Sequence, residues 1–128
     1  MTGARAEIVD AGLVDPVRLF GFDQKILFSP AARGEGFIKL AMTTGRRGTR
    51  SVAHAHPRDE VTLTLSGEAI LHAGGESHRL TPGIAVRLPP GLEHEVEVVS
   101  EEWTVVAAYC DECSLCRPSN SNGSASSC

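Results

Sequence analysis

The sequence predicts an all-β protein whose antiparallel strands form a jelly-roll barrel of two sheets. Two observations carry this prediction. Glycine and proline interrupt short apolar runs at close intervals along the 128 residues, which is typical of β-sandwiches and barrels. Helical periodicity is nearly absent, and the runs are evenly spaced, as the strands of antiparallel sheets are.

Ten segments are predicted as strands, and turn sequences separate several of them. The Gly-Gly pair at 74–75 indicates a tight hairpin, and Thr-Pro-Gly at 81–83 and Pro-Pro-Gly at 89–91 are typical of turns. In chain order the predicted strands are 17–20, 25–28, 36–43, 51–56, 60–65, 68–73, 77–80, 84–88, 93–99 and 103–109.

The chain has the length of one domain with its own core and is short for two domains. We expect an N-terminal segment over residues 1–14, a single β-domain over residues 15–110, and a Cys- and Ser-rich tail over residues 111–128. From Arg117 the tail reads RPSNSNGSASSC. It is too polar to be buried, and we expect it to be disordered beyond residue 117.

Composition excludes two classes of partner. A net charge of -4 and a pI near 5.7 disfavour a nucleic-acid surface, because phosphate binding needs clustered Lys and Arg. No apolar run approaches the roughly 20 residues of a membrane span, and the first ten residues lack the apolar stretch of a secretory signal. We therefore expect a cytoplasmic protein that binds neither nucleic acid nor membrane.

Three histidines and one glutamate are spaced as metal ligands are. His54 and His56 are two residues apart, so in a strand their side chains share one face, about 6.6 Å apart at Cα. Pro57 interrupts the run because it donates no ladder hydrogen bond, and Glu60 then re-enters from the next strand. His94 arrives from a later strand.

His94 is predicted to point into the barrel. It shares parity with the apolar Val96 and Val98, whereas glutamates occupy the alternate positions 93, 95 and 97. His72 and His78 flank the Gly-Gly turn instead, so we expect both to be solvated and exclude them as ligands.

The predicted metal ligands are therefore His54, His56, Glu60 and His94, holding one divalent ion. Three imidazoles and a carboxylate accept Fe(II), Zn, Ni, Mn or Cu. We favour Fe(II), because a closed structural zinc more commonly uses cysteine and the cysteines here lie elsewhere. Such a ligand set leaves one or two coordination positions open for water, dioxygen or substrate.

Two segments carry a family resemblance. Quoted as they stand, GTRSVAHAHPRDEVTLTLSG and GIAVRLPPGLEH resemble the two sequence motifs of the cupin superfamily almost position for position. Val98 departs from the pattern, since many cupins have asparagine there. The resemblance implies a double-stranded β-helix, a metal held by the four residues named above, and a homodimer. It also implies dioxygenases, decarboxylases, isomerases, lyases and polyketide cyclases as candidate activities.

The function predicted first is a mononuclear Fe(II) dioxygenase-type oxidoreductase that acts on a small organic metabolite. Glu60 would be either the fourth ligand or a catalytic general base. A high arginine and alanine content with only two lysines suggests a GC-rich genome and a role in bacterial secondary metabolism. One alternative is a redox-neutral lyase, isomerase or cyclase that uses Zn or Ni. The other is a sensor module that binds a metal or a metabolite without turnover.

Parity in the strand after Glu60 predicts the walls of the pocket. Thr62 and Thr64 share the face of Glu60, whereas the apolar residues at 61, 63 and 65 take the outer face. We expect a second subunit to cover that outer face, and the alternative is that residues 7–28 fold across it. Further pocket candidates, also compatible with the core, are Phe28, Lys39, Met42, Trp103 and Tyr109.

The cysteines form a separate feature after the last predicted strand. Cys110, Cys113 and Cys116 are spaced as at the start of a bacterial ferredoxin run, but the fourth position is Asn120, which disfavours an iron–sulfur cluster. Free thiols are the first interpretation in a reducing cytoplasm. A zinc or redox role that includes Cys128 is the alternative.

Overall fold

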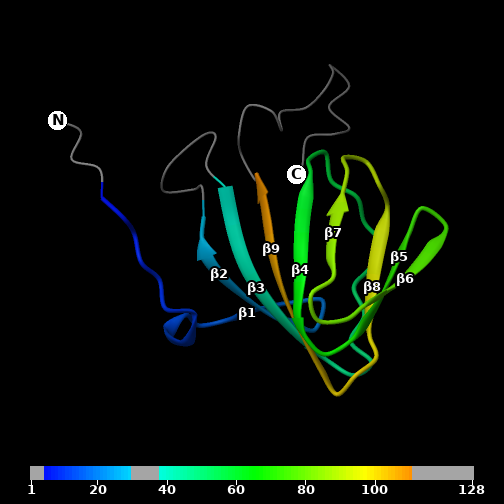
Figure 1. The fold of residues 1–128 in the computed structure, drawn as a ribbon, viewed down its shortest axis with the longest axis horizontal. Coiled ribbons are helices and arrows are strands. Elements are labelled where there is room, and N and C mark those ends of the chain that lie inside the picture. The colour runs from blue at the N-terminus through cyan, green and yellow to red at the C-terminus, as the bar shows by residue number, and fades with distance from the viewer. Residues whose placement is uncertain (1–4, 30–37, 111–128) are drawn as a thin grey trace.

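The computed structural model describes residues 5–29 and 38–110, and it confirms an all-β fold (Figure 1). All neighbouring strands pair antiparallel. Within these two ranges the one helix is a short 3-10 turn, η1 (Ala11–Leu13), and no helix is long and apolar enough to cross a bilayer. The strands are β1 (Val17–Leu19), β2 (Phe22–Phe28), β3 (Ile38–Arg46), β4 (Glu60–Ser66), β5 (Ala69–Ala73), β6 (Glu76–Leu80), β7 (Ala85–Leu88), β8 (His94–Val98) and β9 (Glu102–Cys110).

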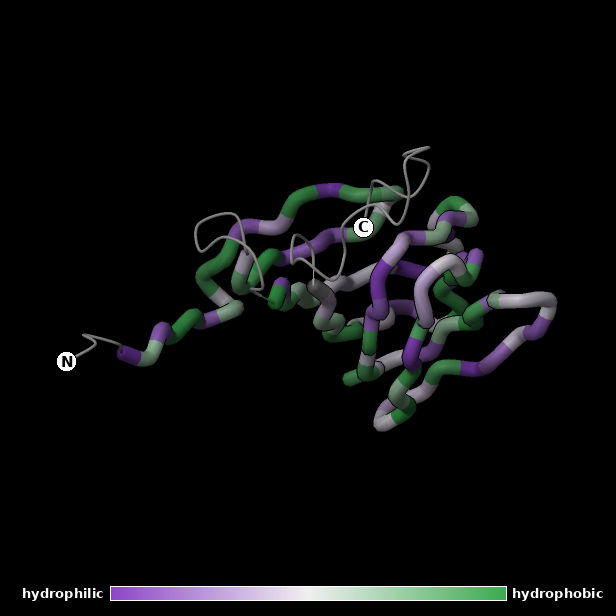
Figure 2. Tube along the Cα trace, turned by 90° about the horizontal axis from the view of Figure 1, so that it is seen from above, coloured by the Kyte–Doolittle hydropathy of each residue, from purple (hydrophilic) through white to green (hydrophobic). Residues whose placement is uncertain are grey.

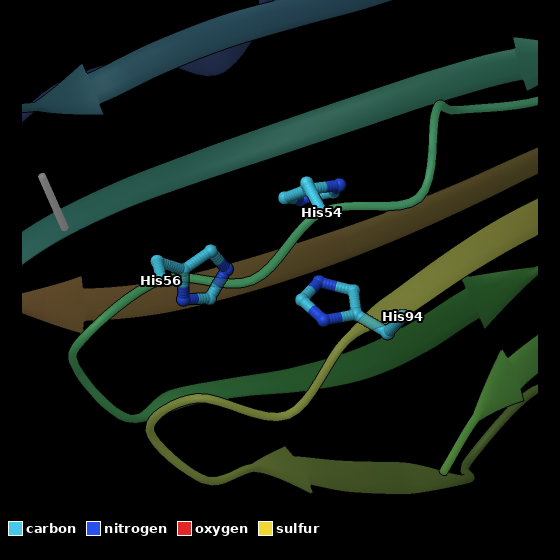
Figure 3. A group of neighbouring side chains, drawn as sticks. All are labelled: His54, His56 and His94. Atoms are coloured by element: carbon cyan, nitrogen blue, oxygen red, sulfur yellow. The ribbon is translucent and has the colours of Figure 1, made fainter. Parts of the chain in front are cut away.

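The strands form two sheets, as in a jelly roll. The larger sheet has the order β1-β2-β3-β9-β4-β7 and the smaller has the order β6-β5-β8. Strands distant in sequence therefore become neighbours, and β9 lies between β3 and β4 along its length. This arrangement brings the start of β4 and the start of β8 to the same end of the barrel as the segment that carries His54 and His56 (Figure 3).

Nine of the ten predicted strands are confirmed within the described residues, and the strand predicted over 51–56 is wrong. That segment meets β8 only through two isolated bridges, Arg50 with Glu97 and His54 with His94. Four residue steps separate Arg50 from His54, but only three separate His94 from Glu97. One extra residue therefore interrupts the ladder, as in a β-bulge. Alternation of side chains could not reveal this insertion, because it depends on the partner strand.

The hydrophobic core lies between the two sheets. Trp103 and Phe22 meet edge to face, with ring centroids 6.3 Å apart, and the Trp103 Nε1 donates a hydrogen bond to Thr64 Oγ1 at 3.2 Å. Gly45 leaves the space that the Phe22 ring occupies, since a Cβ there would lie 2.5 Å from the ring. The buried core residues are Phe22, Ala69, Leu71, Leu80, Leu88, Val98, Trp103 and Val105.

The outer face of β4 is apolar and exposed, as its parity predicted. Val61, Leu63 and Leu65 are 48%, 38% and 46% exposed, whereas Thr64 on the opposite face is 1% exposed. The alternative cover, residues 7–28, does not lie across this face. The strands β1 and β2 extend the larger sheet at the edge of β3, and the residues before η1 run away from both sheets (Figures 1 and 2).

Three of the four cysteines, at 113, 116 and 128, lie outside the described residues, and Cys110 ends β9. The zinc or redox role suggested for them therefore stays a prediction, as do the predicted boundaries of the domain and its tail. The Gly-Gly hairpin is confirmed. Gly74 and Gly75 have φ of 58° and 83° and connect β5 to β6, as in a type I′ turn.

Candidate metal centre

His54 and His94 are brought together by their own backbones. Each donates its backbone N–H to the carbonyl of the other, both at 2.9 Å. Residues that exchange two hydrogen bonds across an antiparallel pair project their side chains to the same face. Their imidazole centroids consequently lie 4.4 Å apart. The pairing of segment 50–56 with β8, although short, is thus what forms the site.

His56 is positioned by the Pro-Pro-Gly turn before β8. Gly91 has a φ of 80°, which favours glycine, and its N–H donates to the carbonyl of His56 at 2.9 Å. Leu92 N–H closes the same turn on the Pro89 carbonyl at 3.2 Å. This contact ties the loop that carries His56 to the loop that leads into His94.

The three histidines form one group whose donor atoms lie within 4.8 Å of one another (Figure 3). The His56 ring lies 5.5 Å from that of His54 and 5.1 Å from that of His94. Imidazole nitrogens that share an ion lie about 3–4 Å apart, given bonds of about 2.0–2.1 Å. Side-chain shifts of about an ångström would therefore close this group around a single metal ion.

Each of the three rings has its Nδ1 next to a backbone carbonyl. Nδ1 of His54 lies 2.9 Å from the Val52 carbonyl, and Nδ1 of His94 lies 2.9 Å from the Leu92 carbonyl. The third, longer contact joins Nδ1 of His56 to the Arg58 carbonyl at 3.4 Å. A carbonyl can only accept, so Nδ1 carries a proton in all three, and in the neutral form of each ring the lone pair is on Nε2. Such outer contacts orient the histidines of metal sites.

Glu60 begins β4 beside this group. Its Oε1 lies 3.0 Å from Nε2 of His56, and the three-histidine group does not include it. The hydrogen bond to this carboxylate raises the pKa of His56 above its ordinary value. Burial lowers the pKa of His94, which is 6% exposed. The expected role of Glu60 as fourth ligand or general base stays a prediction, which its place next to Nε2 of His56 supports.

The histidines and Glu60 line a cavity of about 360 Å³ between the two sheets. Its other walls are mostly apolar and include core residues such as Leu71, Leu88 and Val105. Among the described residues that line it there is no lysine or arginine. Uncharged polar side chains are contributed by Gln24, Thr43, Ser51, Thr62 and Tyr109.

Two of the five further pocket candidates, Trp103 and Tyr109, line the cavity. The other three do not. Met42 is on the outer face of its strand, since it pairs with Val106 while its neighbour Thr43 faces the cavity. Lys39 lies with its Nζ 5.3 Å from the centroid of the Tyr109 ring, and Phe28 is absent from the lining.

His72 and His78 lie outside the three-histidine group, as predicted. Nδ1 of His72 is 2.8 Å from the Ser77 hydroxyl, and Nε2 of His78 is 3.3 Å from Glu76. Sequence reasoning missed Phe20, Gln24, Thr43 and Ser51 as lining residues. The alternation of Gln24 with the buried Phe22 was a usable signal, whereas nothing in the sequence marked Phe20.

The fold and the three-histidine group define the class of this protein. The model of the cupin domain matches residues 42–109, from β3 to the end of β9. The chain therefore belongs to the cupin family, as its two motifs predicted.

Two curated relatives come from Streptomyces. The chain is 29% identical over 105 residues to the polyketide synthase CurC of Streptomyces cyaneus, which covers 80% of this chain and 67% of that protein. It is 31% identical over 62 residues to the uncharacterized protein SCO3923 of Streptomyces coelicolor, which covers 48% of this chain and 59% of that protein. The chain spans between 25% and 67% of the length of the curated relatives it matches.

Solved structures share the fold at low identity. A predicted oxalate decarboxylase from Thermotoga maritima superposes with a TM-score of 0.74 at 18% identity, covering 81% of this chain and 98% of the other. The polyketide cyclase RemF from Streptomyces resistomycificus gives 0.73 at 17% identity, covering 83% and 80%. KdgF from a Halomonas species gives 0.72 at 20% identity, covering 83% and 94%. These likenesses show the fold alone.

The donor set of the site fits a divalent transition metal. Imidazole nitrogen is a ligand shared by Fe, Ni, Cu and Zn, and three such nitrogens with a neighbouring carboxylate leave positions open for a further ligand. The identity of the ion stays a prediction.

Proposed function

We propose that this protein is a metal-dependent enzyme that converts an apolar, oxygen-bearing organic metabolite without net oxidation, in the manner of a cyclase. One observation carries the proposal. Three histidines line an otherwise mostly apolar cavity next to the Glu60 carboxylate, and their Nδ1 contacts to carbonyls leave the lone pair of each neutral ring on Nε2. The names of the relatives CurC and RemF, a polyketide synthase and a polyketide cyclase, support this choice of chemistry.

His54, His56 and His94 would hold the ion, and the ion, when bound, would polarise a substrate carbonyl as a Lewis acid. The apolar walls would bind the carbon skeleton and exclude water. No lysine or arginine is among the described lining residues, so the walls offer no cationic side chain to an anionic group. Recognition of the substrate by the walls therefore does not depend on such a group.

Glu60 would act first as the general base and then as the general acid of the reaction. In an intramolecular aldol condensation it would take a proton from a carbon that lies between two carbonyl groups. That carbon would then attack another carbonyl of the same molecule, forming a carbon–carbon bond, and the oxygen produced would take the proton back from Glu60. This bond closes the ring as a β-hydroxy ketone, and loss of water would then form a carbon–carbon double bond, so atoms balance without an oxidant.

The experiment supplies a reactive poly-β-ketone, made in situ by a minimal polyketide synthase, to Zn-loaded, Ni-loaded and Fe(II)-loaded protein under nitrogen and under air. We expect a cyclised product, formed under nitrogen by loss of water alone, and its disappearance in His94→Ala. An unchanged product distribution in the presence of the wild-type protein would contradict the proposal.

The Fe(II) dioxygenase expected from the sequence remains the second candidate, since three histidines also suit Fe(II). The same incubations separate the two reactions. A dioxygenase would consume dioxygen in stoichiometric amounts with the Fe(II)-loaded protein and would be inactive under nitrogen. The sensor alternative predicts binding without a product under either gas.

A further inference from the structure

Phe20 has an unusual backbone conformation. It has a φ of 53° and is the one non-glycine residue with positive φ among residues 5–29 and 38–110. Phe20 and Gly21, whose φ is 85°, form the two-residue turn between β1 and β2, and Leu19 pairs with Phe22 across it. Positive φ at both central positions is the pattern of a type I′ turn, which favours asparagine, aspartate and glycine. A bulky aromatic residue there carries a steric cost.

Core packing does not offset that cost. Phe20 is 45% exposed and lies outside the buried core cluster, to which Phe22 two residues later belongs. Its ring instead lines the rim of the cavity together with Leu19. The ring centroid is 6.1 Å from that of His54, at an interplanar angle of 43°. The strained turn thus holds an exposed aromatic ring beside the candidate metal centre.

The rest of the cavity indicates what such a ring would contact. Three further aromatic side chains, those of Phe22, Trp103 and Tyr109, line the cavity, and leucine and valine side chains form much of the remaining wall. Aromatic rings attract one another in stacked or edge-to-face arrangements beyond the gain from burial alone. Backbone strain that nothing in the core explains is characteristic of residues that serve a site.

We propose that Phe20 is a specificity-determining residue that packs against an aromatic ring, either one the substrate already carries or one formed by its cyclisation, whose oxygen substituent faces the three histidines. The ligand class is therefore an aromatic alcohol or ketone rather than a sugar or a small dicarboxylate. The inference rests on the proposed function in one respect only, namely that the cavity is the substrate site.

The test compares Phe20→Asn with a matched control, Val17→Asn, which makes a similar apolar-to-amide change on β1 at an exposed position outside the cavity lining. The probe is 1-naphthol, titrated calorimetrically into Zn-loaded protein, and Tm is measured for each variant. We expect Phe20→Asn to weaken naphthol binding about tenfold. It should also raise Tm by about 2–5 °C, because asparagine relaxes the turn. The control should do neither.

Binding of naphthol by Phe20→Asn within a factor of two of the wild type would overturn the inference. So would a fall in its Tm, which would make Phe20 a structural residue, or wild-type binding weaker than about 1 mM. Zinc content and turnover are measured separately. A wild type that binds no zinc and converts nothing would refute the proposed function, whereas the naphthol affinities of the metal-free proteins would still decide the role of Phe20.

Discussion

Nε2 of His56 lies 3.0 Å from Oε1 of Glu60, so the carboxylate contacts the very nitrogen that a metal ion would take. With Nδ1 of His56 next to the Arg58 carbonyl, both ring nitrogens have an acceptor, so this arrangement favours the protonated ring and raises the pKa of His56. A metal ion can take Nε2 of His56 only from the neutral ring, and its binding leaves the Glu60 carboxylate next to the ion. Proton and metal compete at this position.

Metal affinity should fall on acidification, with His56 setting the transition. The Glu60 hydrogen bond raises the pKa of His56, and burial lowers that of His94, so on acidification His56 takes up a proton before His94 does. Glu60→Gln removes the carboxylate, and the loss of metal should then move to lower pH. Co(II) titrations followed by absorbance between about pH 5.5 and 8 measure this. A transition that stays at the same pH in the variant would contradict the assignment.

Glu60→Gln should also separate catalysis from binding. If Glu60 carries the proton, turnover should drop by about 10²–10⁴-fold while the three histidines retain the ion. The measurement is kcat together with metal content for each protein. His78→Ala is the control, since His78 lies outside the site, and it should leave both quantities unchanged. Full turnover in Glu60→Gln would remove this residue from the mechanism.

Gly67 should tolerate no side chain. A Cβ there would lie 1.9 Å from the Glu102 carbonyl oxygen and 2.7 Å from the Cα of Trp103, and its φ is 77°. Gly67→Ala should therefore lower the free energy of unfolding by about 3 kcal/mol or more. Gly48 has a similar φ of 87°, but a Cβ there would meet no atom of the described residues within 4 Å. Gly48→Ala should therefore cost only about 1–2 kcal/mol. Denaturant unfolding measures both, and equal losses would contradict the clash.

The homodimer expected from the sequence stays a prediction. Val61, Leu63 and Leu65 leave an exposed apolar strip on β4, and a second copy can cover it with the same surface. Light scattering after size exclusion should give twice the 13.6 kDa of one chain. Leu63→Lys should yield monomers, whereas Glu76→Lys on the β5–β6 hairpin should not. A monomeric wild type at micromolar concentration would contradict the expectation.

The sequence predicted most of the strands and the inward orientation of His94 because both follow from alternation. His94 is buried with Val98, whereas Glu95 and Glu97 are less buried and pair with Arg50 at 2.7 and 3.2 Å. The odd or even position of a residue in a strand indicates directly which face of the sheet its side chain takes, since successive side chains point to opposite sides.

Three features could not be read from the sequence. The extra residue between Arg50 and His54 is defined only relative to β8, so the segment was predicted as a regular strand. The contact of Glu60 with His56, rather than with all three rings, depends on side-chain rotamers that alternation does not specify. Phe20 was missed for a similar reason, because its turn favours other residues and its role arises from proximity to His54.

Metal content tests the central claim most directly. Wild type, His94→Ala and His78→Ala are loaded with Zn(II), dialysed and analysed by mass spectrometry for metal per chain, with folding checked by circular dichroism. We predict about one ion per chain in the wild type and in His78→Ala, and a nearly complete loss in folded His94→Ala. A wild type that retains no ion, or a folded His94→Ala that retains as much as the wild type, would contradict a metal centre built on His54, His56 and His94.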